Sequence, residues 1–315
     1  MKKNIIISIA AIMLASCMEE QVMETPQRNA IAFGSVFIEN ATRAAVDPST
    51  QNGKLTAFDV WGFVKEYDGI VFVDQDVILE DGLWTYDGTQ YWAPGQMYYF
   101  SALAPMNSGN IDYELASGEA AKLGLGTVTF TNADGTEDLL YAHDSMLSNG
   151  VGEAADAIQL QFKHLLSKLK FTFRNGFVTE NASIQVRNIK ITAPAEGSID
   201  VAQADFSNGW VLEDEKVTLA FGDVEKLACG KDAESTYERL TIPAPASYAY
   251  LITFDVDLYM GAQLVYTASL ESIVTGVGLE MGKAYNFTAD ITPESLELDN
   301  IAFDVVRVDG WTPIQ

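Results

Sequence analysis

The stretch FDVDLYMGAQLVY, residues 254–266, shows most clearly which kind of fold this chain adopts. Apolar and polar side chains alternate from Phe254 to Tyr259, and a second apolar run from Leu264 to Tyr266 follows Gly261. Alternation with a period of two is typical of a β-strand, and a glycine between two such runs is typical of a hairpin turn. The stretch therefore predicts two antiparallel strands joined by a tight turn.

The same rhythm recurs through most of the chain. Short runs rich in Val, Ile, Phe, Tyr and Thr are separated by Gly, Asn, Asp and Pro, which favours strands and turns. We expect strands at residues 31–38, 58–64, 71–78, 82–86, 97–104, 127–131, 139–142, 158–162, 168–174, 183–192, 210–212, 216–221, 239–242, 251–259, 263–270, 285–291 and 301–308. One helical turn or two could form within residues 114–125, although Gly118 and Gly124 within this range and Gly126 just after it weaken a helix. The sequence predicts an all-β fold.

These strands fall into two consecutive series, each large enough for a β-sandwich. We therefore expect an N-terminal sandwich at residues 30–165 and a C-terminal sandwich at residues 166–315. No Pro-rich or Gly-rich linker separates them, so the two domains are expected to pack closely against each other.

The beginning of the chain has the pattern of an export signal. Lys2 and Lys3 precede an apolar run at residues 4–14, and Leu-Ala-Ser-Cys follows at residues 14–17. The run is too short for a stable membrane span and fits a signal peptide of residues 1–16. The tetrad resembles the bacterial lipobox, which implies that Cys17 is acylated and holds the chain to membrane lipid. An ordinary signal peptide with a cysteine by chance is the alternative. Residues 17–29 are polar and are expected to form a flexible tether.

Composition argues against several classes of function. The formal net charge of −25 makes nucleic acid an unlikely partner. If Cys17 carries lipid, Cys229 has no cysteine left for a disulfide bond. The two histidines, His143 and His164, are too few for most catalytic chemistries, and no Gly-x-Ser-x-Gly or zinc-ligand spacing occurs. We therefore expect no catalytic activity, no metal site and no required cofactor, and we keep a secreted hydrolase only as a weak alternative.

Asp255 and Asp257 share one face of an expected strand, where paired carboxylates could serve acid–base chemistry. In a chain this acidic, we expect them to lie on an exposed strand face instead.

A group of aromatic residues could recognise a ligand. Its members are Trp84, Tyr86, Tyr91, Trp92, Tyr98, Tyr99 and Phe100. Exposed aromatic rings often bind sugars, and this observation supports an alternative function as a surface glycan-binding lipoprotein. Apolar side chains nevertheless lie on both faces of the expected strand at residues 97–104, which is typical of a strand buried in a sandwich. We expect most of these rings to belong to the core.

Several motifs, taken in order, resemble the fimbrillin family of Bacteroidales, which supplies subunits of type V pili. They are the lipobox, Ile31-Ala32-Phe33, Thr42-Arg43-Ala44, Val60-Trp61-Gly62-Phe63, Tyr91-Trp92-Ala93-Pro94-Gly95, Phe100-Ser101-Ala102-Leu103-Ala104-Pro105, Asp138-Leu139-Leu140-Tyr141-Ala142 and Phe162-Lys163-His164-Leu165-Leu166-Ser167-Lys168-Leu169. The series covers nearly the whole chain. The resemblance implies two tandem transthyretin-like or immunoglobulin-like sandwiches and a structural or adhesive role in a fimbrium.

The resemblance also implies a route of maturation. An outer-membrane lipoprotein precursor, exposed at the cell surface, would be cut by an Arg-specific protease between Arg43 and Ala44. The cut would release the strand at residues 31–38, whose apolar residues are Ile31, Phe33, Val36 and Ile38. Another pilus subunit would then supply a replacement strand. Without the resemblance, Arg43 would be interpreted as a surface arginine in a loop.

The end of the chain repeats part of that strand. Residues 301–308 share Ile-Ala-Phe with residues 31–38, and a Val follows three positions later in both. Ile301, Phe303, Val306 and Val308 therefore form a candidate donor strand, although coincidence is an equal alternative. Little sequence follows Trp311, which favours a tip or accessory subunit that receives a strand. A host or bacterial surface ligand is compatible with such a position.

Overall fold

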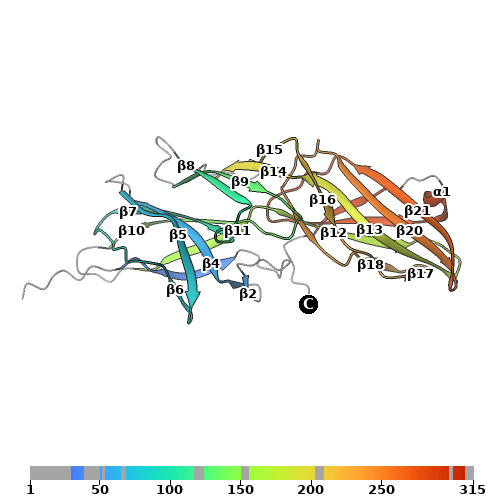
Figure 1. Cartoon of the computed structure of the whole chain (residues 1–315), viewed down its shortest axis with the longest axis horizontal. Helices are drawn as coiled ribbons and strands as arrows, with labels where there is room; N and C mark the ends of the chain where they lie inside the picture. The colour runs from blue at the N-terminus through green and yellow to red at the C-terminus, as the bar shows by residue number, and fades with distance from the viewer. Residues whose placement is uncertain are drawn as a thin grey trace, which may run out of the picture.

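A computed structural model describes residues 30–38, 50–51, 54–64, 69–116, 124–149, 156–202, 209–297 and 301–308 (Figure 1). Nearly all of the regular structure in these residues is β. The elements are β1 (Phe33–Ile38), β2 (Thr50–Gln51), β3 (Lys54–Leu55), β4 (Ala57–Val64), β5 (Gly69–Glu80), β6 (Leu83–Thr85), β7 (Met97–Ala104), β8 (Ile111–Leu115), β9 (Leu125–Thr131), β10 (Leu140–Leu147), β11 (Ile158–His164), β12 (Ser167–Asn175), β13 (Ala182–Pro194), β14 (Glu196–Asp200), β15 (Val211–Leu212), β16 (Lys216–Ala220), β17 (Leu227–Ala228), β18 (Asp232–Glu234), β19 (Arg239–Thr241), β20 (Tyr250–Met260), β21 (Gln263–Val274), β22 (Ala284–Ile291), α1 (Pro293–Glu297) and β23 (Asp304–Val308). The expectation of an all-β fold is confirmed.

A seven-stranded sheet with the order β1-β11-β10-β7-β4-β5-β6 dominates the N-terminal part of the molecule. Its middle strands β4 and β7 are apolar on both faces, as expected of strands with neighbours on every side. One face covers a core that includes Phe58, Tyr98, Phe100 and Phe162. The two edge strands of this sheet are β1 and β6.

Two sheets form a sandwich in the C-terminal part, at the opposite end of the long axis (Figure 1). One sheet has the order β18-β12-β22-β23 and the other has the order β16-β13-β20-β21. Residues of both sheets, among them Phe171, Phe173, Val186 and Phe254, are fully or almost fully buried in one apolar core. The edge strand β23 belongs to this sandwich.

A smaller sheet, β15-β14-β9-β8, joins the two parts. It takes β8 and β9 from before residue 165 and β14 and β15 from after it. A third core cluster, which includes Trp61, Leu139, Leu165, Ile199 and Leu240, lies in the same region. Because strands from both halves pair in this sheet, the division at residues 165–166 stays a prediction.

The hairpin expected from residues 254–266 is confirmed. β20 and β21 pair antiparallel, Met260 faces Gln263 across the turn, and Gly261 has a φ of +62° that an L side chain rarely adopts. The helix considered at residues 114–125 is wrong at both described ends, because Glu114 lies in β8 and Leu125 lies in β9. Residues 117–123 lie outside the described residues.

The exposed face expected for Asp255 and Asp257 is wrong for Asp257, whereas Asp255 is partly exposed. Asp257 is buried, and its carboxylate accepts a hydrogen bond from Arg187 Nε at 2.8 Å. Asp255 accepts one from Ser269 Oγ at 2.7 Å. Arg187 stands directly across from Asp255 on the neighbouring strand β13, so a cation and two carboxylates form one network. The pair therefore stabilises the sheet structurally.

Other groups considered for chemistry do not form a reactive site. His164 is buried and its Nδ1 lies 2.6 Å from Asp138 Oδ2, whereas His143 is exposed. Within the described part of the chain, no three His, Cys, Asp or Glu side chains come together in a way that could hold a metal ion. The same residues include no helix that is long and apolar enough to cross a membrane.

Candidate functional site

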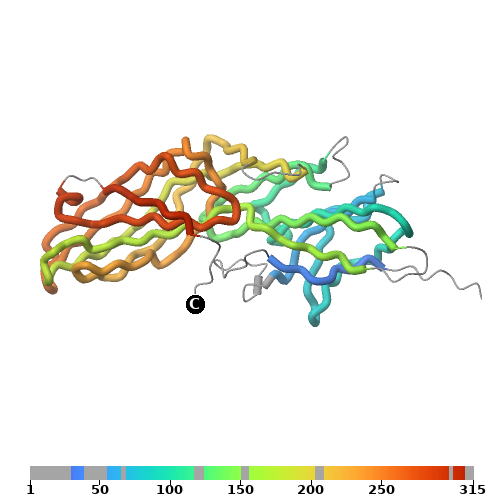
Figure 2. Tube along the Cα trace, turned by 180° about the vertical axis from the view of Figure 1, so that it is seen from behind, coloured from blue at the N-terminus to red at the C-terminus, as the bar shows by residue number. Residues whose placement is uncertain are grey.

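The strand β1 lies at the edge of the seven-stranded sheet and pairs in parallel with β11 (Figure 2). Among the described residues, β11 is its one hydrogen-bonded strand neighbour. The pairing sets Phe33 opposite Ile158 and Ile38 opposite Phe162. A strand held by a ladder on one side can be removed without breaking any other strand pairing.

Ile31, just before β1, and Phe33, its first residue, anchor the segment in the core. Ile31 is 2% exposed and Phe33 is 6% exposed. The Phe33 ring contacts the rings of Phe58, Phe72 and Tyr86, with centroid distances of 5.6, 5.9 and 6.0 Å. The Tyr86 hydroxyl also donates a hydrogen bond to the Ile31 carbonyl at 2.7 Å. Most of the apolar burial of this segment is therefore concentrated at its N-terminal end.

The second half of β1 is held less tightly. The pairing with β11 is irregular between Phe33 and Val36, next to Gly34, where a Cβ atom would come within 2.9 Å of the Gln159 side chain. A glycine inside a strand often marks such a bulge. After it, Val36 and Ile38 are partly buried against the core. The four apolar residues named for this segment, Ile31, Phe33, Val36 and Ile38, thus all contact the core.

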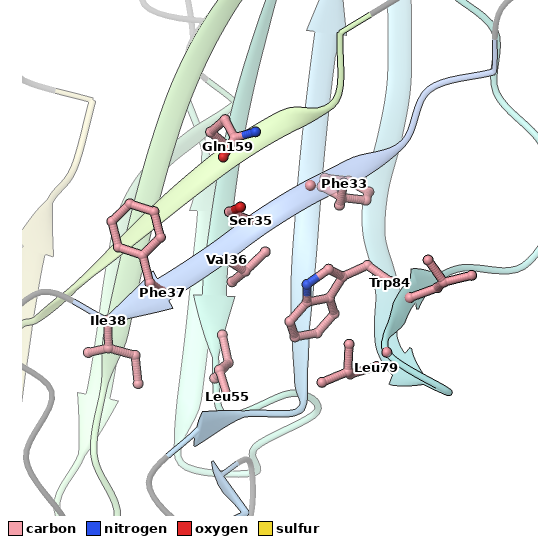
Figure 3. Close-up of a pocket in the computed structure, with 12 residues that line it drawn as sticks. Phe33, Ser35, Val36, Phe37, Ile38, Leu55, Leu79, Trp84 and Gln159 are labelled. Atoms are coloured by element: carbon pink, nitrogen blue, oxygen red, sulfur yellow. The ribbon is translucent and has the colours of Figure 1, made fainter.

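A groove runs beside β1, between this strand and the opposite edge of the sheet (Figure 3). It has a volume of about 730 Å³. Apolar residues predominate in its lining, which includes Val36, Ile38, Leu55, Leu79 and Trp84. A long open groove with an apolar lining and a strand edge on one side suits an extended peptide segment. The sequence indicated the strand at residues 82–86, but not that its side chains would face residues 31–38 across the curled sheet.

Comparisons with known proteins give the family. The family model described as "Fimbrillin-like" matches residues 42–311. The chain belongs to the fimbrillin-like family. Its members are structural proteins, so this fimbrillin-like protein is a pilus or adhesive subunit and not an enzyme. Its place is at the cell surface, as a pilus component.

Solved structures agree with the fold of this fimbrillin-like protein. A fimbrial protein from Bacteroides vulgatus ATCC 8482 is 14% identical, with a TM-score of 0.53, and the match covers 90% of this chain and 99% of that one. A protein from Bacteroides eggerthii DSM 20697, provisionally assigned to cell adhesion, is 12% identical with a TM-score of 0.52, and the match covers 91% and 98%. At these identities the likeness concerns the fold. No protein with a curated description matches the sequence.

The candidate donor strand of the fimbrillin-like chain lies in its own C-terminal sandwich. β23 pairs antiparallel with β22, and the Phe303 ring packs on the rings of Phe171, Phe173 and Phe254. Ile301 is 1% exposed, whereas Val306 points outward and is 57% exposed. Val306 therefore differs from Val36, the residue at the same place in β1, whose side chain faces the core. The bulge in β1 explains this difference, because it turns Val36 toward the core, whereas in the regular strand β23 the preceding residue, Val305, faces the core.

Three other predicted sites of the fimbrillin-like chain, Cys17, Arg43 and Ala44, lie outside the described residues. Their roles in lipidation and cleavage stay predictions.

The aromatic residues considered for sugar binding are mostly part of the core. Trp92, Tyr98 and Phe100 are 7%, 2% and 1% exposed. Trp84 is partly buried and lines the groove beside β1, and Tyr91 is exposed. Among these rings, Tyr91 is the one with a largely solvent-facing surface, so the arrangement gives the glycan-binding alternative little support.

Proposed function

We propose that this fimbrillin-like chain is a pilus subunit that is held inactive until β1 is removed and then completed by a strand from a neighbouring subunit. The observation that carries the proposal is the position of β1 at a sheet edge, with Phe33 buried, Val36 and Ile38 partly buried, and one strand neighbour among the described residues. Such a strand can be replaced by another of similar pattern.

Removal of residues 30–38 would leave two unsatisfied surfaces. The rings of Phe58, Phe72 and Tyr86 would lose the Phe33 side chain that covers them. The free edge of β11 would lose its partners, including the bond from the Ile158 amide to the Ala32 carbonyl at 2.9 Å. Exposed apolar area and an open strand edge both favour capture of another strand by β-augmentation. The groove already present beside β1 would enlarge into the receiving site.

The proposed maturation begins at the membrane. The lipobox at residues 14–17 supports acylation of Cys17 and attachment to the outer membrane, and Arg43 supports cleavage by an Arg-specific protease. Cleavage after Arg43 would separate the lipid and the whole of β1 from the remaining chain, because both precede the cut. The anchor would thus keep the precursor at the membrane until the strand is released.

Two arginines flank β1 and allow a matched experiment. Arg28 precedes the strand and Arg43 follows it, so cleavage after Arg28 would remove the lipid but leave β1 in place. We expect Arg43→Ala to abolish incorporation into fibres and Arg28→Ala to leave it unchanged. Mass spectrometry of the amino terminus in isolated fibres should give Ala44. Fibres that retain Cys17 or begin at Asn29 would contradict the processing model.

The strand at residues 301–308 is a separate proposal, because it pairs with β22 in the C-terminal sandwich. If it also acts as a donor, it must leave β22. A disulfide between Asn286→Cys and Val306→Cys, which are paired positions, would lock it in place. Locked subunits that still accept a strand but no longer extend the fibre would support donation. Unimpaired extension would show that residues 301–308 are not the donor strand.

A further inference from the structure

A second cavity lies away from the groove beside β1. It has a volume of about 220 Å³ and lies where β4, β5, β7 and β8 approach the loop after β7. Its polar lining includes Asp59, Asp74, Asn107, Ser108 and Tyr113. None of these residues belongs to the strand-exchange site, so the cavity is independent of that proposal.

One carboxylate in this cavity is incompletely satisfied. Asp59 is 6% exposed, and its Oδ2 accepts a hydrogen bond from the Asn107 amide at 2.8 Å. Its Oδ1 is buried and has no hydrogen-bond partner. A buried carboxylate oxygen without a donor is unfavourable, because it has lost its hydrogen bonds to water and no hydrogen bond within the protein replaces them. Asp59 Oδ1 therefore lacks a donor.

Two further carboxylates increase the negative charge. Asp76 is the cross-strand partner of Asp59, and its Oδ1 accepts a hydrogen bond from Asn107 Nδ2 at 3.2 Å. Asp74 lines the cavity. Like charges directly opposite each other in a sheet are unfavourable. Among the described residues, the ion pairs that are found involve none of these three.

The side chains that line the cavity indicate which chemical group could donate a hydrogen bond to Asp59 Oδ1. The carboxylates do not converge as a metal site requires, since the described residues contain no such group of three. An ammonium or guanidinium group is less demanding, because it presents several N–H donors and can bond separated oxygens. The neighbouring Trp61 and Tyr113 rings, 4.7 Å apart between centroids, add aromatic surface that favours a cation. The net charge of −25 would attract a basic partner surface.

We propose that this cavity binds the cationic head of a lysine or arginine side chain presented by a partner protein, with the free Oδ1 of Asp59 as the principal acceptor. The side chain would enter from solvent past Tyr113 and Asp74.

Ionisation of Asp59 sets the conditions of the test. Burial, together with Asp74 and Asp76, raises the pKa of Asp59 to about 7. The facing titratable groups are Asp74, Asp76 and Tyr113. Binding should therefore be measured at pH 8, where Asp59 is ionised, and should weaken as the pH falls below 7.

The test follows the indole N–H signal of Trp61 by NMR in the full chain, assigned through its absence from Trp61→Phe. The probes are capped arginine and capped lysine, with capped norleucine as an uncharged probe of similar length. We expect saturable shifts with the two cationic probes and none with norleucine. Asp59→Asn should weaken binding by about tenfold or more. The exposed Asp87→Asn, which removes the same charge elsewhere, should leave the affinity unchanged.

Several outcomes would overturn the proposal. They are equal binding of norleucine, no saturable shift at pH 8, undiminished binding by Asp59→Asn, and saturation of the signal by Ca²⁺ alone. Tighter binding of spermidine than of either capped amino acid would assign the cavity to a free polyamine. If Asp59→Asn does not fold, Asp74→Asn provides the second variant and should weaken binding in the same direction.

Discussion

The segments that contain the first and the last described strands, residues 31–38 and 301–308, begin with the same three residues and are anchored in the same way, yet they continue differently. Ile31 and Ile301 are both buried, and the carbonyl of each accepts a hydroxyl hydrogen bond at 2.7 Å, from Tyr86 and Ser272 respectively. Phe33 and Phe303 each contact three aromatic rings. Beyond the tripeptide, β1 is parallel and interrupted, whereas β23 is antiparallel and regular.

Burial of the apolar tripeptide and pairing of the strand with its neighbour are separate contributions. In both segments the tripeptide anchors the chain in the core, so this anchor alone does not decide which strand is removable. The strand that follows makes the difference, because β1 borders an open groove and has a disturbed register, whereas β23 continues its own sandwich in an unbroken register. A replaceable strand is therefore expected to combine a firm anchor with weak pairing.

The largest effect is expected from truncating the two aromatic anchors. Phe33 is more deeply buried than Phe303, which is only partly buried. We expect Phe33→Ala to lower the free energy of unfolding by about 3–5 kcal/mol and Phe303→Ala to lower it by roughly half as much. Urea denaturation combined with hydrogen exchange of β11 and β22 measures both changes.

The exposed Phe37 provides the control for this comparison. It is 49% exposed and belongs to the same strand as Phe33. Phe37→Ala should change the free energy of unfolding by about 0.5 kcal/mol or less. A greater loss from Phe303→Ala than from Phe33→Ala would show that the two anchors are not ranked by burial.

The two halves that carry these strands should respond to pH in opposite directions. Burial raises the pKa of Asp59 to about 7, so the folded state holds its proton more strongly than the unfolded chain does. The resulting stabilisation is complete below the ordinary pKa of 3.8 and is lost as the pH rises through about 7. Hydrogen bonds from Asn188 and from Arg187 lower the pKa values of Asp255 and Asp257, so their stabilisation is lost as the pH falls below about 4.

Hydrogen exchange, corrected for its intrinsic pH dependence, can measure this contrast. Between pH 5 and pH 8 the protection of β4 should fall by about tenfold or more, whereas that of β20 should stay constant. Asp59→Asn should remove the change in β4. A fall of equal size in β20 would show that a general loss of stability, and not Asp59, is responsible.

The hairpin and most strands followed from residue patterns because alternation and turn glycines act locally. The short strands β8 and β14 were missed. β8 alternates, but its last two residues were included in the helix considered at residues 114–125, whereas β14 has little alternation. The pairing of both strands with β9 depends on tertiary structure. The strand at residues 31–38 and its apolar residues were predictable from sequence, but the groove was not. It depends on the curvature that brings Leu79 and Trp84 opposite Val36. The bulge was signalled only by Gly34 within an otherwise strand-like run.

A smaller effect is expected from the hydroxyl groups that hold the two isoleucine carbonyls. Tyr86→Phe and Ser272→Ala should each lower the free energy of unfolding by about 1 kcal/mol, because each leaves an isoleucine carbonyl without its hydrogen-bond donor. Tyr86→Phe should lower it slightly more, since the Tyr86 hydroxyl also accepts a hydrogen bond from the Gln90 amide. Equal stability of Tyr86→Phe and the parent chain in urea denaturation would remove this bond from the anchor of β1.

The smallest effect concerns the ion pair on β23. Arg307 Nη1 lies 3.0 and 3.1 Å from the two carboxylate oxygens of Glu280, but both side chains are more than 40% exposed. Solvent screening and side-chain entropy leave such pairs little net energy, so Arg307→Gln should lower the free energy of unfolding by about 0.5 kcal/mol or less. Hydrogen exchange of β22 should hardly change. A loss above about 1 kcal/mol in urea denaturation would mean that β23 is held by its ion pair as well as by Ile301 and Phe303, and the likeness between the two anchors would then be incomplete.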